Sequence, residues 1–267
     1  MMNALMKKTV MTPLPALALI FALALCGCNR VNPVIEMGLA IEDMKAGRLS
    51  EVIVRTDACL RVDHENLDAR LLNGYCRFMM AGKEAERKNA LYELGKCTRL
   101  YADSASAWYY YGYVLAQSNQ LREALSPLRK ALSLMPAGTP ARDHAALLLA
   151  KCCVENNLQA EAASLLQPLQ QRLPYARWPQ LHNAMGMLAL KRGQPRLAMG
   201  HFSNGLCRSR NNEALLQNLA VTADLYLNDV PAAMGYYRQL MVQRSRRGDR
   251  EGMAQLQNRM RQLAKRQ

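Results

Sequence analysis

Cysteine and histidine are the residue types in this sequence that are best suited to metal binding, redox chemistry or nucleophilic catalysis. Among the six cysteines that follow Cys28, no two have the CxxC spacing of a structural zinc site, and no two histidines have HxxxH spacing. The adjacent Cys152 and Cys153 would point to different faces of a helix, which makes a poor bidentate site. The residues in question are Cys59, Cys76, Cys97, Cys152, Cys153 and Cys207 with His64, His144, His182 and His201.

Sequence motifs of enzymes are missing as well. The sequence has no G-x-S-x-G nucleophile motif, no Walker-type glycine loop and no dinucleotide fingerprint. We therefore expect neither an enzyme nor a protein that holds a metal or an organic cofactor.

The N-terminus has the pattern of a secretory signal peptide. Lys7 and Lys8 precede an apolar run from Leu14 to Leu25, which is shorter than the roughly 20 residues that a membrane-spanning helix needs. Translation could also begin at Met6, which opens the more usual sequence MKKTVM. Either start predicts export of the chain.

The apolar run ends in LCGC, residues 25–28, which resembles the lipobox of bacterial lipoproteins. The small Gly27 favours Cys28 as the lipid-modified residue, with Cys26 as the alternative. In such lipoproteins, a residue like Asn29 at the next position, instead of aspartate, implies sorting to the outer membrane. The resemblance implies a signal peptide over 1–27, a tether over 28–32 and an outer-membrane protein that faces the periplasm. The alternative is a core helix with two buried cysteines.

The chain is strongly basic. Its formal net charge is +14, and about +12 remains once Lys7 and Lys8 leave with the signal peptide. From Arg238 onward, nine Lys and Arg residues stand against Asp249 and Glu251, which gives this stretch a charge of +7. Such a stretch can contact phospholipid headgroups or acidic protein, and export makes nucleic acid the least favoured partner.

The passage from residue 106 to 136, SAWYYYGYVLAQSNQLREALSPLRKALSLMP, has a readable pattern of small and large apolar residues. Gly112 and Ala124 are small enough for two antiparallel helices to approach closely, Leu115 and Leu128 fill the space beside them, and Pro136 cannot continue a helix. With Trp108, Tyr111 and Ala131, this spacing resembles the tetratricopeptide repeat, a helix-turn-helix unit of 34 residues.

The same register recurs along the chain, with turn residues between the two helices of each unit. We predict six repeats over residues 33–247, which start near 33, 67, 105, 143, 179 and 214, and a basic cap helix over 248–267. The predicted fold is an all-α, right-handed superhelical solenoid. The predicted turn residues are Gly47, Asn119, Asn157, Gly193 and Asn228, and the cap helix has Met253, Leu256, Met260 and Leu263 at helical spacing.

The register also indicates what the cysteines do. Cys59 and Cys97 stand at the twenty-seventh position, where a small residue is needed, and Cys153 stands at the eleventh, which is core. Cysteine at such positions behaves as a small hydrophobic residue. A disulfide among Cys59, Cys76 and Cys97 is the alternative in an oxidising compartment.

In tetratricopeptide arrays the first helix of each repeat lines a groove, chiefly through its second, fifth, ninth, twelfth and thirteenth positions. The resemblance implies a groove with aromatic and Met side chains at one end and amides at the other, which suits an apolar peptide segment. The alternative for each residue is packing against a neighbouring helix. The Lys and Asn pairs of carboxylate-clamp arrays are not matched. The predicted groove residues are Leu71, Tyr75, Phe78, Met79, Tyr109, Tyr113, Leu147, Lys151, Asn183, Met187, Lys191, Asn218, Thr222 and Tyr226.

In repeat number, length and lipobox, the chain resembles pilotin-like lipoproteins that assist assembly of type IV or tight-adherence pili and of the secretin. The resemblance implies a non-catalytic, lipid-anchored scaffold for a protein of pilus, secretin or envelope-assembly machinery. Adaptors for cell-wall hydrolases or for outer-membrane protein insertion fall in the same class. The alternative from another class is a soluble cytoplasmic chaperone for a secreted protein. Six cysteines that stay unpaired would suit that compartment, where thiols are reduced.

Overall fold

The computed structural model describes residues 31–265. The predicted signal peptide, both candidate lipid-attachment cysteines and the start of the tether lie outside the described residues. Within 31–265 every regular element is helical. The α-helices are α2 (Pro33–Lys45), α3 (Leu49–Val62), α4 (Leu67–Met80), α5 (Glu84–Leu100), α6 (Ala105–Gln117), α7 (Leu125–Leu134), α8 (Pro140–Glu155), α9 (Gln159–Gln170), α10 (Pro179–Lys191), α11 (Pro195–Arg208), α12 (Glu213–Val221), α13 (Val230–Arg247) and α14 (Arg250–Ala264). A 3-10 turn η1 (Tyr175–Arg177) and a π-helical turn η2 (Thr222–Tyr226) complete the elements.

The chain divides into two compact units, Met1–Asn73 and Gly74–Gln267. In the first unit α2 packs against α3, and the side chain of Asn32 caps α2 by accepting a hydrogen bond from the Val34 amide at 3.0 Å. A buried carboxylate, Asp43, joins the two helices through ion pairs to Arg48 (2.6 Å) and Arg55 (2.5 Å). These pairs satisfy the one buried charge of α2.

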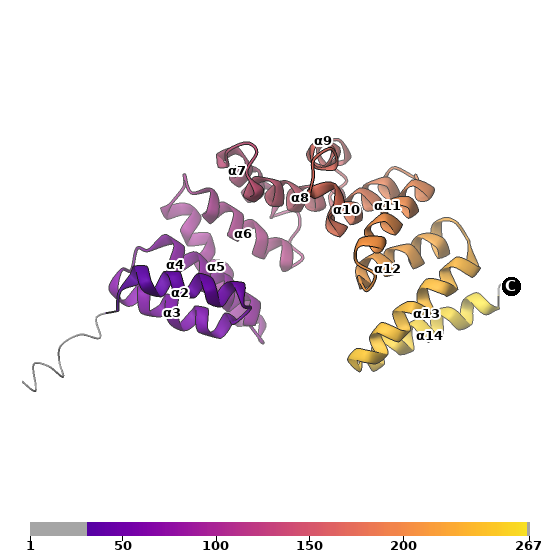
Figure 1. Ribbon diagram of the computed structural model, residues 1–267, viewed down its shortest axis with the longest axis horizontal. Coiled ribbons are helices and arrows are strands. Elements are labelled where there is room, and N and C mark those ends of the chain that lie inside the picture. Colours follow the sequence, from indigo (N-terminus) through magenta and orange to yellow (C-terminus); the bar gives the residue numbers. More distant parts are fainter. Residues whose placement is uncertain (1–30, 266–267) are drawn as a thin grey trace, which may run out of the picture. The chain divides into compact units, whose positions relative to one another are not determined.

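In the second unit the helices pack in chain order, and each runs antiparallel to the one before it. The pairs are α6 with α7, α8 with α9, α10 with α11 and α12 with α13. Figure 1 shows α7 and α9 on the outer side of the row formed by α6, α8 and α10. The prediction of an all-α array of helix pairs is confirmed for the described residues.

Glycine sets the spacing inside the pairs. A Cβ at Gly112 of α6 would lie 2.7 Å from Cγ of Leu128 in α7, and a Cβ at Gly186 of α10 would overlap the ring of Phe202 in α11. Leu128 and Phe202 are both fully buried. The close helix approach predicted from the small residues is therefore present, because any side chain there would push the two helices apart.

Each predicted turn residue has a left-handed backbone. Asparagine and glycine tolerate positive φ angles better than other residues, since glycine lacks Cβ and asparagine bonds to its own backbone. The residues lie between the two helices of their pairs, which is where the sequence pattern put them. Their φ angles are +74° for Gly47, +60° for Asn119 and Asn157, +70° for Gly193 and +52° for Asn228.

Two first helices begin earlier than the residues from which the repeats were counted. α8 begins at Pro140 instead of 143, and α12 begins at Glu213 instead of 214. The cause is local capping: the Thr139 hydroxyl accepts a hydrogen bond from the Arg142 amide, and Pro140 is favoured in a first helical turn. In α12 the Asn212 side chain accepts from the Leu215 amide at 3.1 Å.

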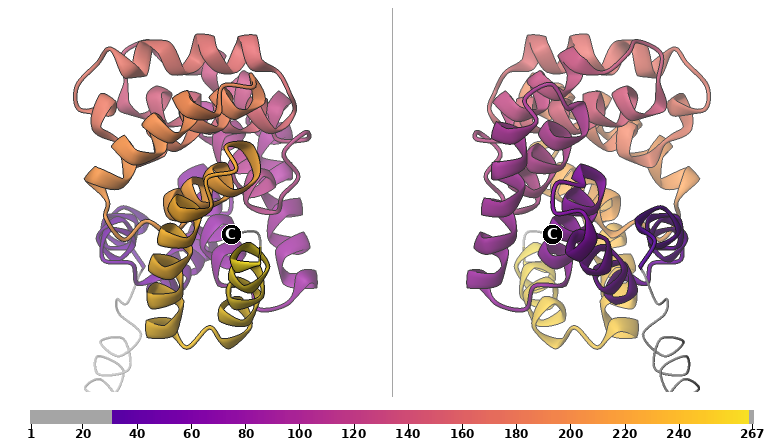
Figure 2. Two further views of the ribbon diagram at one scale, coloured as in Figure 1. Left: turned by 90° about the vertical axis from the view of Figure 1, so that its right-hand side faces the viewer. Right: turned by 90° about the vertical axis from the view of Figure 1, so that its left-hand side faces the viewer.

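The last helix, α14, lies beside α13, as both views of Figure 2 show. Its buried face includes Leu256 and Leu263. Arg259 of α14 reaches the buried Asp224 of η2 with two hydrogen bonds of 2.6 and 2.7 Å, and Tyr237 of α13 donates another at 2.9 Å. A buried ionic network therefore holds α14 to the last repeat.

Five cysteines lie in the cores: Cys59, Cys76, Cys97, Cys152 and Cys153. Cys59 and Cys76 have free thiols, so the alternative of a disulfide between them is wrong for this structure. Burial raises the pKa of the Cys152 thiol to about 11 and that of the Cys153 thiol to about 12. Both thiols are therefore protonated at neutral pH and poor nucleophiles.

The helices and the polar side chains of residues 31–265 bear on the membrane and metal predictions. No helix there combines the length and apolar character that crossing a bilayer requires. Nor do three or more His, Cys, Asp or Glu side chains in these residues come together in an arrangement that could hold a metal ion.

Candidate binding pocket

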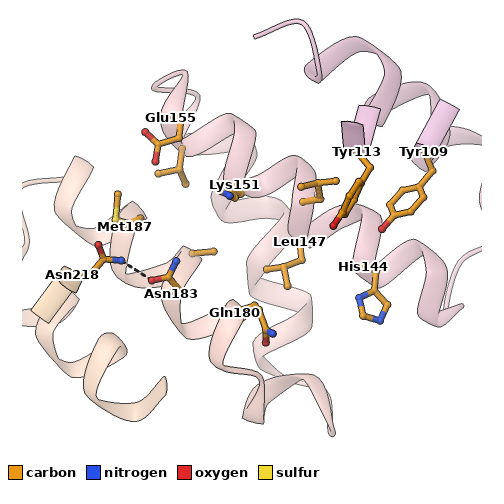
Figure 3. A pocket seen from close by; sticks show the side chains of 13 residues that line it. Tyr109, Tyr113, His144, Leu147, Lys151, Glu155, Gln180, Asn183, Met187 and Asn218 are labelled. Carbon is orange, nitrogen blue, oxygen red and sulfur yellow. Dashed lines mark hydrogen bonds between the residues drawn. The ribbon is translucent and has the colours of Figure 1, made fainter. Parts of the chain in front are cut away.

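Side chains from four first helices of the second unit surround one open pocket of about 410 Å³. Figure 3 shows them pointing toward a common space from α6, α8, α10 and α12. Seven predicted groove residues are brought together here. They come from the first helices of successive repeats, and in the sequence a second helix lies between each first helix and the next. They are Tyr109, Tyr113, Leu147, Lys151, Asn183, Met187 and Asn218.

The α6 end of the pocket is aromatic. The rings of Tyr109 and Tyr113 lie 6.2 Å apart, and each ring also contacts Tyr110 or Tyr75 edge-on at 5.6 to 5.8 Å. Burial, and then the neighbouring tyrosines, raise the pKa of Tyr109 to about 12. This end therefore offers the neutral hydroxyl of Tyr109 and fixed ring faces at neutral pH.

The α8 wall mixes apolar and charged groups. Leu147 and Leu148 are half-buried, whereas Lys151 and Glu155 are exposed and stand one helical turn apart on the same helix. His144 lies nearest the aromatic end (Figure 3). The charges of Lys151 and Glu155 cancel, so the lining carries no formal net charge with His144 neutral.

The far end of the pocket carries amides from two successive repeats. Nδ2 of Asn218 donates a hydrogen bond to Oδ1 of Asn183 at 2.7 Å, which fixes both side chains across the boundary between α10 and α12 (Figure 3). An amide has two N–H donors and one oxygen acceptor, so each asparagine keeps further hydrogen-bonding capacity. Met187 lies beside the two amides, and Gln180 of the same helix lines the pocket between them and His144 (Figure 3).

Three predicted groove residues are buried, and their assignment to an open surface is wrong. Leu71 is 1% exposed and Phe78 is 5% exposed, so both are core residues. Thr222 is fully buried at the start of the π turn η2, and its hydroxyl donates to the Asn218 carbonyl at 2.6 Å.

The remaining predicted residues are accessible but do not line this pocket. Met79 and Tyr226 are about half exposed, and Lys191 is exposed at the end of α10. Tyr75 is half-buried and supports the pocket indirectly, since its ring contacts Tyr113 at 5.6 Å.

Six lining residues were not predicted. His144 and Gln180 stand at the second position of their repeats, and Val154 and Glu155 stand at the twelfth and thirteenth, so the groove positions themselves could have identified these four. The sixth-position residues Leu148 and Ala184 lie outside the positions considered.

Comparison with known proteins depends on solved structures, because no family model and no curated protein matches the chain. The structure titled "Crystal structure of PilW, widely conserved type IV pilus biogenesis factor" has a TM-score of 0.66, is 19% identical and covers 86% of this chain and 99% of its own. The described helices thus follow one another as in a known tetratricopeptide-type array. The chain has the tetratricopeptide-repeat fold.

Two further structures support the fold. One, from Pseudomonas aeruginosa, is titled "Functional Characterization of Pseudomonas Aeruginosa pilF"; it has a TM-score of 0.63, is 18% identical and covers 85% of this chain and 97% of its own. YrrB, described as a tetratricopeptide-repeat protein with an unusual peptide-binding site, has a TM-score of 0.51, is 16% identical and covers 75% and 96%. At such identities the likeness extends to the fold alone.

Proposed function

We propose that the chain is a non-catalytic scaffold whose pocket on α6, α8, α10 and α12 binds an extended segment of a partner protein. The observation that carries this proposal is the convergence of side chains from four first helices on one open pocket of about 410 Å³. A cleft of this size that is largely apolar, with a few converging polar groups, is typical of a binding site.

The two ends of the pocket suit different parts of a peptide. The Asn183 and Asn218 amides can donate to and accept from a peptide backbone, while Tyr109, Tyr113 and Leu147 offer contact area to a large apolar side chain. The formally neutral lining favours an uncharged segment over an acidic or basic one.

We further propose that the scaffold is anchored through Cys28 to the periplasmic face of the outer membrane and assists assembly of a pilus or secretin. The lipobox-like LCGC motif supports the anchor. Two of the structures with this fold concern PilF and PilW, the latter described as a type IV pilus biogenesis factor, which makes pilus machinery the first partner to test. Adaptors for cell-wall hydrolases or outer-membrane protein insertion remain further candidates.

The peptide site can be tested without knowing the partner. Short peptides selected from a displayed random library against the full chain would be synthesised and their affinities measured for the parent and for the double variant Asn183→Ala with Asn218→Ala. Losing one or two backbone hydrogen bonds should weaken binding about 10-fold. A second double variant, Tyr109→Ala with Tyr113→Ala, should weaken binding of the apolar side chain while helical content is retained.

Asn204→Ala is the matched control, because Asn204 is an exposed asparagine on α11, a second helix outside the pocket. Its affinity should equal that of the parent. Selected peptides that bind all of these variants equally well would overturn the pocket assignment.

The anchor requires a separate test. The same test distinguishes a lipid-anchored scaffold from a soluble cytoplasmic chaperone. The free, buried thiols of Cys76, Cys152 and Cys153 are compatible with that alternative. Intact mass and membrane fractionation would compare the native chain with Cys28→Ser in a bacterium that processes lipoproteins. Cleavage before Cys28 with added acyl mass, and release of the variant from membranes, would support the anchor. A full-length soluble product from both would favour the chaperone.

A further inference from the structure

The first described helix, α2, exposes an apolar face to solvent. Val34 is 80% exposed, Ile35 59%, Ile41 45% and Leu39 41%. At 100° per residue these four side chains lie within about half of the helix circumference. Glu42 and Lys45 share this half of the helix as an exposed ion pair, but they lie at its C-terminal end, farther from residue 33 than the four apolar side chains. The opposite side of α2 carries the buried Ala40 and Asp43. We call Val34, Ile35, Leu39 and Ile41 the α2 apolar face.

Every carboxylate of α2 is neutralised by a cation. Glu36 pairs with Arg55 at 3.1 Å, and Glu42 pairs with Lys45 at 2.7 Å. Asp43, which is buried, pairs with both Arg48 and Arg55. Because all three acidic groups are paired, α2 presents no uncompensated negative charge that an anionic surface would repel.

The α2 apolar face lies close in sequence to the proposed lipid anchor. Only residues 29–32 separate Cys28 from Pro33, the first residue of α2. A fully extended chain spans at most about 3.6 Å per residue, so the start of α2 lies within roughly 18 Å of the acylated residue. An anchor this short holds α2 near the leaflet surface whatever conformation the tether adopts.

From these observations we propose that the α2 apolar face contacts the phospholipid leaflet and inserts its side chains at the interface. This inference rests on the proposed anchor at Cys28. Apolar side chains on a helix that is held at a bilayer gain by burial at the headgroup boundary, and a lipid anchor is strengthened by such a second contact. The contact would fix how the first unit lies on the membrane. A second copy of the chain is the competing occupant.

The test uses tryptophan fluorescence of the full acylated chain in phosphatidylethanolamine and phosphatidylglycerol vesicles, with and without brominated acyl chains as quencher. Ile35→Trp places the probe on the α2 apolar face. Val54→Trp is the matched control, because Val54 is 66% exposed on the neighbouring helix α3. The emission of the parent chain is subtracted from both, and intact mass and vesicle flotation establish acylation and membrane attachment.

We expect the Ile35→Trp emission to shift to shorter wavelength and to be lost to the brominated lipid, with neither change at Val54→Trp. An acylated, vesicle-bound chain whose Ile35→Trp emission is not quenched would overturn the membrane contact and leave the anchor standing. A blue shift without quenching would indicate a second copy and would also overturn it. A chain without acyl mass at Cys28 would remove both the anchor and the contact.

Discussion

Single glycines determine how closely the helices of a repeat approach. Gly186 in α10 faces the ring of the fully buried Phe202, whereas Gly200 in α11 has no neighbouring atom within 4 Å of an added Cβ. The two positions therefore test the same substitution in opposite environments.

We predict that Gly186→Ala lowers the free energy of unfolding by about 1 to 3 kcal/mol, because the added methyl overpacks the contact with Phe202. Gly200→Ala should instead raise it by about 0.5 to 1 kcal/mol, since alanine is the better helix former and meets no obstacle. Urea unfolding followed by circular dichroism measures both. Equal effects from the two substitutions would contradict the close packing of α10 on α11.

The ion pairs of Asp43 predict a dependence of stability on pH. Hydrogen bonds from Arg55, and then from Arg48, hold the pKa of Asp43 below its ordinary value of 3.8. A lowered carboxyl pKa stabilises the fold above the unfolded pKa, and this stabilisation is lost as the pH falls through the folded pKa.

We therefore expect Asp43→Asn to melt well below the parent at pH 6, with the gap closing as the pH falls below 3.8. Thermal melts from neutral to strongly acidic pH would follow this. Asp103→Asn, at an exposed loop position before α6, should show no such gap. A gap at Asp43→Asn that stays constant with pH would argue against the ion pairs.

Residue types in the sequence predicted where the backbone takes a left-handed conformation, because few residue types tolerate it. Asn119, Asn157 and Gly193 stand where the chain needs a left-handed residue, and each has a positive φ. Side-chain exposure was less predictable, because it depends on neighbouring helices that the repeat pattern does not describe. Leu71 and Phe78 follow the groove spacing and are nevertheless core residues.

Among the elements, α14 is joined to the last repeat by an ionic network as well as by its apolar face. Asp224 is buried in the π turn η2, and Arg259 of α14 pairs with it through two hydrogen bonds. The apolar spacing of Leu256 and Leu263 predicted a helix here. That spacing describes only the apolar face of α14, so it predicted neither the π turn nor the buried carboxylate within it.

We predict that Arg259→Met destabilises the chain by about 3 kcal/mol, because removing one partner of a buried ion pair leaves a buried charge without its cation. Arg261→Met is the control, since Arg261 is exposed on the same helix. Hydrogen exchange should show α14 amides opening first in Arg259→Met. Unchanged protection of α14 would show that its apolar face alone suffices.

At the scale of the whole molecule, repetition made the fold predictable and left the partner open. The small-residue and turn positions recur through the chain, so finding the same register in several repeats supported the assignment of each one. Seven of the pocket residues followed from the same register. The identity of a bound segment depends on chemistry outside this chain, and repeat motifs carry no information about it.

The measurement that tests the central claim most directly is site-specific photo-crosslinking in native cells. Benzoylphenylalanine would replace Leu147 in the pocket, and Leu197, 51% exposed on the second helix α11, would be the control position. We predict a discrete protein adduct from position 147 that is lost in the Asn183→Ala, Asn218→Ala background and absent from position 197. An adduct that persists in that background, or one formed only from position 197, would contradict the account.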